Sequence, residues 1–310
     1  MKQKHRLYIV GNGFDIFHGL PCRYTDFRMW LQQNRPQTYT LLNDVYSPDG
    51  EWWKDFEVNL GNLDILKLRE KSSKCAEQRE EYCSHIADIP IPVRGLHDAP
   101  EYNSGEKLKQ LYAEIDGALK QWIDEVERAY ICKRELYLNS GSFYISFNYT
   151  NLLEDVYNIP PTNVMYVHGN SKRGEKLIWG HNKSAGELEY LYQNKGESLP
   201  EDRDMQQILT EYENKRKNPF EYIYKNDYIL SSRPLADTVI VLGLSFSPVD
   251  EYYFTGNSSL LKHISHDAQW FISWYSEQDK TNVEQLMKKA FLGKPLPNYI
   301  FIQMSDLQCK

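Results

Sequence analysis

Near its beginning the chain reads RLYIVGNGFD, residues 6–15, and this stretch decides the fold. Residues 6–10 are apolar and partly β-branched, which is typical of a strand buried in a parallel sheet. A glycine turn follows, and after it a helical pattern that runs to about Leu31. A strand, a glycine turn and a helix in this order open a nucleotide-binding βα unit. We therefore expect an α/β domain.

Strand and helix patterns alternate along the rest of the chain. This alternation predicts a Rossmann-like fold, a mostly parallel sheet with helices on both faces. We expect a single domain over residues 1–310, with helical insertions at about 70–138 and 183–235. Further strands are predicted at 142–147, 163–168, 176–180, 238–243, 270–275 and 299–302, and helices at 51–68, 106–138 and 152–157.

The charge balance argues against a nucleic-acid partner. The chain carries 36 Lys and Arg against 43 Asp and Glu, a formal net charge of −7. Sequence-independent binding of nucleic acid needs a basic surface that displaces counterions. The basic run Lys215-Arg216-Lys217 is interpreted as a solvated helix face.

Cysteine usage and hydropathy point to a soluble protein of the reduced cytoplasm. The five cysteines are odd in number, irregularly spaced and without a C-x-x-C pair, so they predict neither a disulfide framework nor a zinc site. The apolar run of residues 7–10 is too short for a signal peptide, and no stretch approaches the length of a membrane span. We expect no membrane partner.

Polar and glycine residues follow five of the predicted strands. In an open α/β sheet, ligands bind outside the carboxyl ends of the strands, so a recurrence at that end predicts a site. The residues concerned are Gly11, Asn12, Gly13 and Asp15 after the first strand; Asn148, Tyr149 and Thr150; His168, Gly169 and Asn170; Gly180 and His181; and Gly243, Ser245, Ser247 and Asp250.

The glycine turn after the first strand has two readings. Gly11 and Gly13 let a phosphate approach the backbone, and the helix behind them offers free N–H groups. Neither G-x-G-x-x-G nor a P-loop is present, so a tight βα turn without a ligand stays open. Asp15 either caps the helix or binds ribose hydroxyls or a leaving base.

His168 and Asn148 are the candidate reacting groups. Histidine is the natural general base at neutral pH, although a lone histidine is also often structural. The amide of Asn148 donates and accepts at once, so it can orient both a sugar hydroxyl and a water, but an Asx-turn that closes the strand is the alternative.

Three further patterns carry weaker signals. Glu57 is a carboxylate on an otherwise apolar helix face, either functional or a solvated edge. Residues 243–247 read GLSFS, which lacks the second glycine of a nucleophile elbow and continues to proline, so a catalytic serine is not expected. His263 and His266 have no carboxylate between them and make a poor metal pair, so no metal is expected.

The ordered set of motifs resembles the AbiH family of bacteriophage abortive-infection proteins. The resemblance runs from about residue 7 to 254, and the combination is specific although each piece is short. It is carried by YIVGNGFD (8–15), HGLP (18–21), YTDF (24–27), WKDFE (53–57), SFNYT (146–150), VHG (167–169), WGH (179–181) and GLSF (243–246) with Asp250.

The motifs are also distantly similar to sirtuin-like domains, a fold that binds NAD. This resemblance implies that Asn148 and His168 act at the nicotinamide ribose. The sirtuin Asn-Ile-Asp is here Asn148-Tyr149-Thr150, and the zinc cysteines have no equivalent, so protein deacylation is not expected. The implied nucleotide-binding residues are Gly11, Asn12, Gly13, Phe14, Thr150, Gly169, His181, Gly243, Ser245 and Asp250.

Together these observations predict a phage-defence effector that binds NAD or a related nucleotide and cleaves its N-glycosidic bond through an oxocarbenium-like transition state. Asn148 would hold the ribose hydroxyls and the water, His168 would be the base, and Asp15 or Glu57 would stabilise the developing positive charge. A nucleotide-sensing module that acts through a partner, without turnover, is the alternative, and a nuclease is a third reading. A homo-oligomer and a phage-derived trigger are compatible partners.

Overall fold

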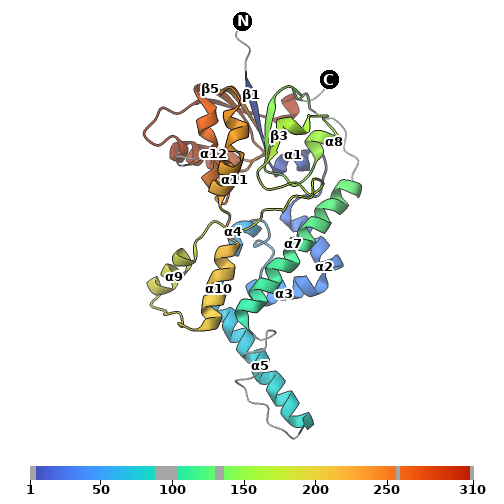
Figure 1. Ribbon diagram of the computed structural model, residues 1–310, viewed down its shortest axis with the longest axis vertical. Coiled ribbons are helices and arrows are strands. Elements are labelled where there is room, and N and C mark those ends of the chain that lie inside the picture. Colours follow the sequence, from blue (N-terminus) through green and yellow to red (C-terminus); the bar gives the residue numbers. More distant parts are fainter. Residues whose placement is uncertain (1–4, 88–102, 130–135, 256–258, 308–310) are drawn as a thin grey trace. The chain divides into compact units, whose positions relative to one another are not determined.

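The structure is a computed structural model, and it describes residues 5–87, 103–129, 136–255 and 259–307 (Figure 1). The chain divides into two compact units. Unit 1 comprises residues 1–23, 120–178 and 218–310, and unit 2 comprises residues 24–119 and 179–217. The chain therefore passes between the units four times, and the single domain with two insertions stays a prediction.

Unit 1 contains a six-stranded parallel sheet in the order β3-β2-β1-β4-β5-β6. This is the Rossmann strand order, with its topological switch point between β1 and β4. The predicted Rossmann-like parallel sheet is confirmed. The strands are β1 (Arg6–Val10), β2 (Phe143–Ser146), β3 (Val164–Tyr166), β4 (Ala236–Leu242), β5 (Ile264–Ser273) and β6 (Asn298–Ile302).

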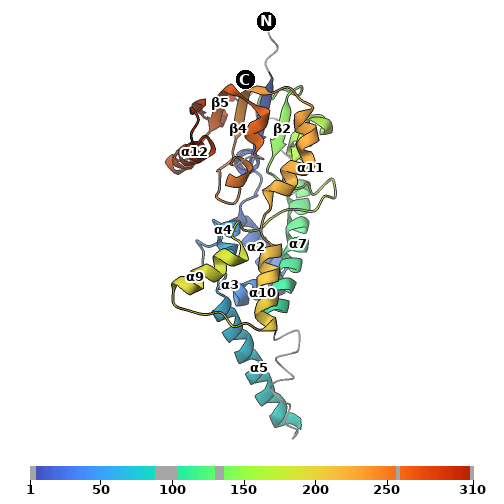
Figure 2. The ribbon, with the colours of Figure 1, turned by 60° about the vertical axis from the view of Figure 1, so that its left-hand side comes forward.

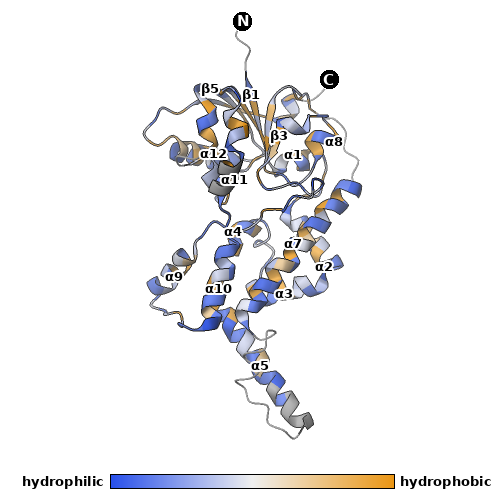
Figure 3. Ribbon diagram, viewed as in Figure 1, coloured by the Kyte–Doolittle hydropathy of each residue, from blue (hydrophilic) through white to orange (hydrophobic). Residues whose placement is uncertain are grey.

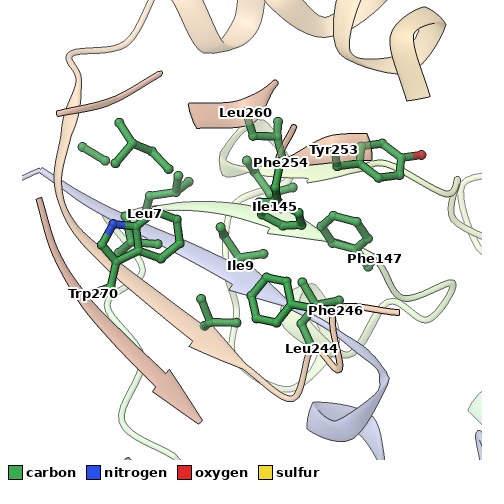
Figure 4. Close-up of a cluster of buried hydrophobic side chains, with 14 of the residues drawn as sticks. Leu7, Ile9, Ile145, Phe147, Leu244, Phe246, Tyr253, Phe254, Leu260 and Trp270 are labelled. Carbon is green, nitrogen blue, oxygen red and sulfur yellow. The ribbon is translucent and has the colours of Figure 1, made fainter. Parts of the chain in front are cut away.

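One face of the sheet forms the main apolar core of unit 1 (Figure 4). Figure 4 labels Leu7 and Ile9 of β1 within this cluster. These two residues lie in register with Val239 and Val241 of β4, so all four side chains share a face. The helices α11 (Pro219–Ser231) and α12 (Glu277–Ala290) contribute buried side chains to this cluster (Figures 1 and 2).

The opposite face of the sheet is also buried. It carries Tyr8 and Val10 of β1 beside Tyr144 and Ser146 of β2. The Tyr8 and Tyr144 rings stack with centroids 4.6 Å apart. Because both faces are covered, the central strands read as continuous apolar runs, and the sequence made them easy to predict.

Unit 2 consists of helices around aromatic side chains. Trp53, Phe27 and Phe56 are fully buried, and the Trp53 and Phe56 rings stack at 5.4 Å. Figure 3 shows apolar and polar residues alternating along α7, as an amphipathic helix requires. The helices are α2 (Tyr24–Asn34), α3 (Pro36–Tyr46), α4 (Phe56–Leu60), α5 (Ile65–Ala87), α9 (Ala185–Asn194) and α10 (Arg203–Asn214). The helix α7 (Ser104–Ala129) belongs to unit 2 up to Leu119 and to unit 1 from Lys120 on.

The predicted strand at 176–180 is wrong. Ile178 N donates to His168 O at 2.8 Å, but no strand ladder forms there. The chain leaves unit 1 after Ile178, and Gly180 has a φ of +147°, which breaks an extended run.

Three helix boundaries also differ from the prediction. The first helix, α1 (Asn12–Phe17), stops before Gly19, whose φ of +83° ends it, and α2 begins afresh at Tyr24. The helix predicted over 51–68 is split at Gly61 into α4 and α5. The helix predicted over 106–138 does not reach its predicted end, because Tyr137 N bonds Leu307 O instead; residues 130–135 lie outside the described ranges.

Candidate functional site

Three glycines meet where β1 and β4 end. Gly11 N donates to Leu242 O at 2.9 Å, and Gly13 N donates to Gly243 O at 2.7 Å. A Cβ on Gly11 would lie 2.6 Å from Leu244 Cα, and one on Gly13 would lie 2.8 Å from Gly243 Cα. The turn therefore needs glycine because two backbones touch, and this contact favours the tight-turn reading over phosphate approach.

Three N–H groups of this turn, those of Gly11, Gly13 and Phe14, are already engaged. Besides Gly11 and Gly13, Phe14 N donates to Gly11 O at 2.9 Å. The helix behind the turn, α1, has six residues and no side-chain cap. Asp15 is not that cap, so the capping interpretation is wrong: its carboxylate accepts hydrogen bonds from the segment after β2.

Asp15 is a buried carboxyl group with an exposed fraction of 1%. Asn148 Nδ2 donates to its Oδ1 at 2.7 Å, and Thr150 Oγ1 donates to its Oδ2 at 2.6 Å. Burial raises its pKa from 3.8 to about 7, against the lowering effect of these two bonds, and the charge of Glu127 adds to the rise. Asp15 therefore exchanges a proton near neutral pH.

Asn148 lies at the carboxyl end of β2, and its amide is oriented by two acceptors. Nδ2 faces Asp15 Oδ1 and, at 3.1 Å, Gly11 O. The carbonyl of Gly11 only accepts, so the nitrogen must point this way and Oδ1 points the other way. Among the described residues Asn148 Oδ1 is buried without a hydrogen-bond partner. The Asx-turn interpretation is wrong, because the side chain reaches the end of β1 instead.

His168 follows β3 and pairs with Asp250. Its Nδ1 lies 3.1 Å from Phe147 O, a carbonyl that only accepts, so Nδ1 carries a proton. Its Nε2 lies 3.4 Å from Asp250 Oδ1. Rings of Phe147 and Tyr253 meet the imidazole edge-on. A carboxylate beside Nε2 stabilises the doubly protonated ring, so this pair is suited to take up a proton.

The other predicted residues of unit 1 differ in burial and in their contacts. Asn12 is exposed and donates to Cys22 O at 2.8 Å, and Phe14 is fully buried beside the His18 ring. Gly169 has a φ of +77°. Ser245 is exposed, and its carbonyl lies 3.5 Å from the Asn282 amide.

Two predicted site residues belong to unit 2. Glu57 binds the ammonium of Lys217, whose Nζ lies 2.9 Å from both carboxylate oxygens, and its Oε1 also accepts from Gly180 N at 3.2 Å. The Glu57 and Lys217 side chains are 11% and 1% exposed. The solvated-edge alternative for Glu57 is therefore wrong, and so is the prediction that Lys217 belongs to a solvated helix face.

His181 is fully buried in unit 2. Its Nε2 donates to Tyr212 O at 3.0 Å, and its ring stacks on Tyr212 with centroids 4.0 Å apart. Burial lowers its pKa to about 4, so it is neutral at physiological pH. Its role in nucleotide binding stays a prediction.

Two residues of these networks are not apparent from the sequence. Glu127, near the end of α7, accepts a hydrogen bond from Asn151 N, and burial raises its pKa. Lys217 neutralises Glu57 from 160 positions away in the chain. The sequence around a charged residue in an amphipathic or polar stretch does not indicate a partner far away in the chain. No local pattern therefore distinguished Glu127 and Lys217 from other charged residues.

The comparisons with known proteins bear on this arrangement. A family model described as bacteriophage abortive infection AbiH matches residues 7–274. The chain belongs to the AbiH family. The match begins in β1 and ends after β5, so it covers the centre around Asp15, Asn148 and His168 and also the Glu57 pair of unit 2. Membership of the AbiH family implies a function in bacteriophage abortive infection.

No curated protein and no solved structure matches the chain. Among the residues described, no helix of this AbiH protein is both long and apolar enough to span a membrane. Within the same ranges no three His, Cys, Asp or Glu side chains are placed to hold a metal ion.

Proposed function

We propose that this AbiH protein acts in abortive infection by binding NAD, or a related nucleotide, at the carboxyl ends of β1, β2, β3 and β4 and hydrolysing its N-glycosidic bond. The strand order supports the place, because nucleotides bind at the switch point of such sheets. The observation that carries the proposal is Asn148 Oδ1, a buried acceptor with no partner among the described residues, next to a carboxyl group that titrates near pH 7.

Asn148 is the proposed ribose-binding residue. A buried acceptor without a hydrogen bond costs about 1–3 kcal/mol, and a sugar hydroxyl would remove that cost. Asp15 and Gly11 O hold the amide nitrogen, so Oδ1 is presented in one orientation before any ligand arrives. Asp15 thus positions Asn148 in this scheme.

The His168–Asp250 pair is the proposed proton acceptor. In the reaction the bond between ribose C1′ and the nicotinamide nitrogen breaks, and its electron pair neutralises the positive charge of the ring. A water oxygen bonds to C1′, and the proton it loses goes to the His168–Asp250 pair. The products are nicotinamide, ADP-ribose and a proton.

The developing positive charge on the ribose needs a negative group nearby. Of the two carboxylates predicted for this role we assign it to Asp15. The charge of Glu57 is neutralised by the Lys217 ammonium. Asp15 accepts from the neutral groups of Asn148 and Thr150, so its ionised form, which is populated at and above about pH 7, keeps its negative charge.

The test follows NAD in cells that express the protein and are infected with phage, because the trigger is then present. With the wild type we expect cellular NAD to fall and nicotinamide to rise after infection, and His168→Ala and Asn148→Ala to abolish both changes. His266→Ala and Asn194→Ala, at exposed positions, are the matched controls and keep the wild-type response. Unchanged NAD in infected wild-type cells that still restrict the phage overturns the hydrolase proposal.

A nucleotide sensor without turnover is the second candidate. The burial of the two candidate reacting groups favours it. The exposed fractions of Asn148 and His168 are only 6% and 3%. Calorimetry with purified protein separates the two functions: saturable binding of NAD or ADP-ribose with no nicotinamide released indicates a sensor.

A further inference from the structure

Unit 1 holds a cavity of about 220 Å³ at the amino ends of its strands. Arg6 begins β1, Phe143 begins β2 and Ala236 begins β4, and all three line the cavity. The candidate site described above lies at the carboxyl ends of the same strands. The cavity is therefore a separate place on the sheet, and its ligand is independent of the proposed hydrolysis.

Arg233 is the main charged group of this cavity. Its guanidinium carbon lies 4.0 Å above the centroid of the Phe143 ring, and one NH2 group donates to Thr162 O at 2.7 Å. A second, longer bond runs from the same NH2 group to Asn163 Oδ1 at 3.4 Å. Stacking and these bonds fix the plane of the guanidinium, and within the described part of the chain its other donors have no partner. Among the described residues no carboxylate pairs with Arg233, and burial alone lowers its pKa.

The rest of the lining adds positive charge and neutral polar groups. Arg6 and His5 contribute from the start of β1, and the described residues include no Asp or Glu in the lining. The nearby carboxylates are turned to other partners: Asp237 accepts from His5 N at 3.1 Å, and Asp227 holds His263 and Lys262. The full lining is His5, Arg6, Leu7, Asn139, Gly141, Ser142, Phe143, Leu230, Arg233, Pro234, Ala236 and His263.

We propose that this cavity binds a small phosphate-bearing molecule, with Arg233 and Arg6 on its phosphate group. Two arginines line the cavity and none of the described lining residues is a carboxylate, so the cavity attracts an anion; the Arg6 side chain also interacts with the Tyr8 hydroxyl. The planar fork of arginine matches two phosphate oxygens. The volume exceeds what a lone phosphate needs, and Leu7, Leu230 and Ala236 offer an apolar wall for the remainder of the molecule.

The test is calorimetric titration of the full chain with inorganic phosphate, pyrophosphate, ribose 5-phosphate and AMP, beside ribose and acetate. We expect saturable binding of at least one phosphorylated probe and none of ribose or acetate. Arg233→Met lowers that affinity about tenfold or more, since a charge-assisted hydrogen bond is lost, and Arg6→Met lowers it severalfold. Arg203→Met, at an exposed arginine of unit 2, changes nothing.

Arg233 also bonds Thr162 O, so loss of binding in Arg233→Met is accepted only where its melting temperature is close to the wild type. Arg233→Lys is the second variant, because it keeps the charge but not the fork, and we expect it to bind more weakly than the wild type. The proposal is overturned if no phosphorylated probe binds, if acetate binds equally well, or if affinity is the same in Arg6→Met, Arg233→Lys and the wild type.

Discussion

At the scale of single residues, the Asp15 carboxyl group decides how stability depends on pH. In the unfolded chain it ionises near pH 4, whereas burial keeps it protonated in the folded protein up to about pH 7. The folded state therefore binds more protons between these values. Stability from this group is fully present below pH 4 and is lost as the pH rises to about 7.

Asp15→Asn removes this titration. We expect its free energy of unfolding, relative to the wild type, to rise by about 2–3 kcal/mol between pH 5 and pH 8, since one unit of pKa corresponds to about 1.4 kcal/mol. Urea denaturation at both pH values measures the change, and Asp267→Asn, at a fully exposed side chain, is the control. A difference from the wild type that does not vary with pH contradicts the buried, protonated Asp15.

Thr150 is a second residue whose replacement should change the pKa of Asp15 and the stability of the protein. Its hydroxyl donates to Asp15 Oδ2 at 2.6 Å, and this bond lowers the Asp15 pKa. We expect Thr150→Val to raise that pKa above about 7 and to cost about 1–3 kcal/mol, more at pH 8 than at pH 5, because the charged carboxylate gains most from the donor. An NMR titration of the Asp15 carboxyl carbon reads the midpoint directly, and a midpoint that stays or falls refutes the assignment.

At the scale of elements, the junction of β1, α1 and β4 depends on Gly243. This residue has a φ of +67°, and a Cβ there would lie 2.1 Å from Phe14 N and 2.4 Å from Gly13 C. The atoms in the way belong to backbone, so no side chain can turn aside. The start of α1 is thus held in place against the end of β4.

Gly243→Ala is expected to destabilise unit 1 by about 3–5 kcal/mol, from overpacking and from a left-handed backbone that alanine disfavours. Gly293→Ala is a matched control, because Gly293 has a φ of +75° but no atom within 4 Å of the added Cβ. It should show only the backbone cost of about 1–2 kcal/mol. Equal losses in the two variants, measured by urea denaturation, would falsify the close-contact explanation of the glycine turn.

An element could be predicted where its own composition reflects its surroundings in the fold. The apolar runs of β1, β2 and β4 are buried on both faces, so composition alone revealed them, and their shared direction placed Asn148 and His168 at one end of the sheet. Residues 176–180 have a similar composition but cross from unit 1 to unit 2, and a local pattern does not reveal where a chain crosses. The same limit hid the true surroundings of Glu57 and His181.

At the scale of the whole molecule, each unit is assembled from segments that are far apart in the chain. Unit 2 joins residues 24–119 to residues 179–217, and the pair of Glu57 and Lys217 links these two segments with both side chains nearly out of contact with water. An isolated ammonium in such a place is costly, whereas a neutral apolar pair of similar size is tolerated.

Glu57→Gln is therefore expected to destabilise the protein by about 3–5 kcal/mol, because it leaves the Lys217 charge buried without its partner. The double variant Glu57→Met/Lys217→Met should recover most of that loss, since both charges leave together. Lys54→Met breaks the exposed pair with Glu51, in the same segment, and should cost less than about 1 kcal/mol.

Chemical denaturation of the wild type and the three variants measures these differences in the free energy of unfolding. If the double variant is as unstable as Glu57→Gln, the segments are joined by the charges and their hydrogen bonds themselves; if it recovers, the cost lay in the unpaired ammonium, as burial of the Lys217 side chain implies.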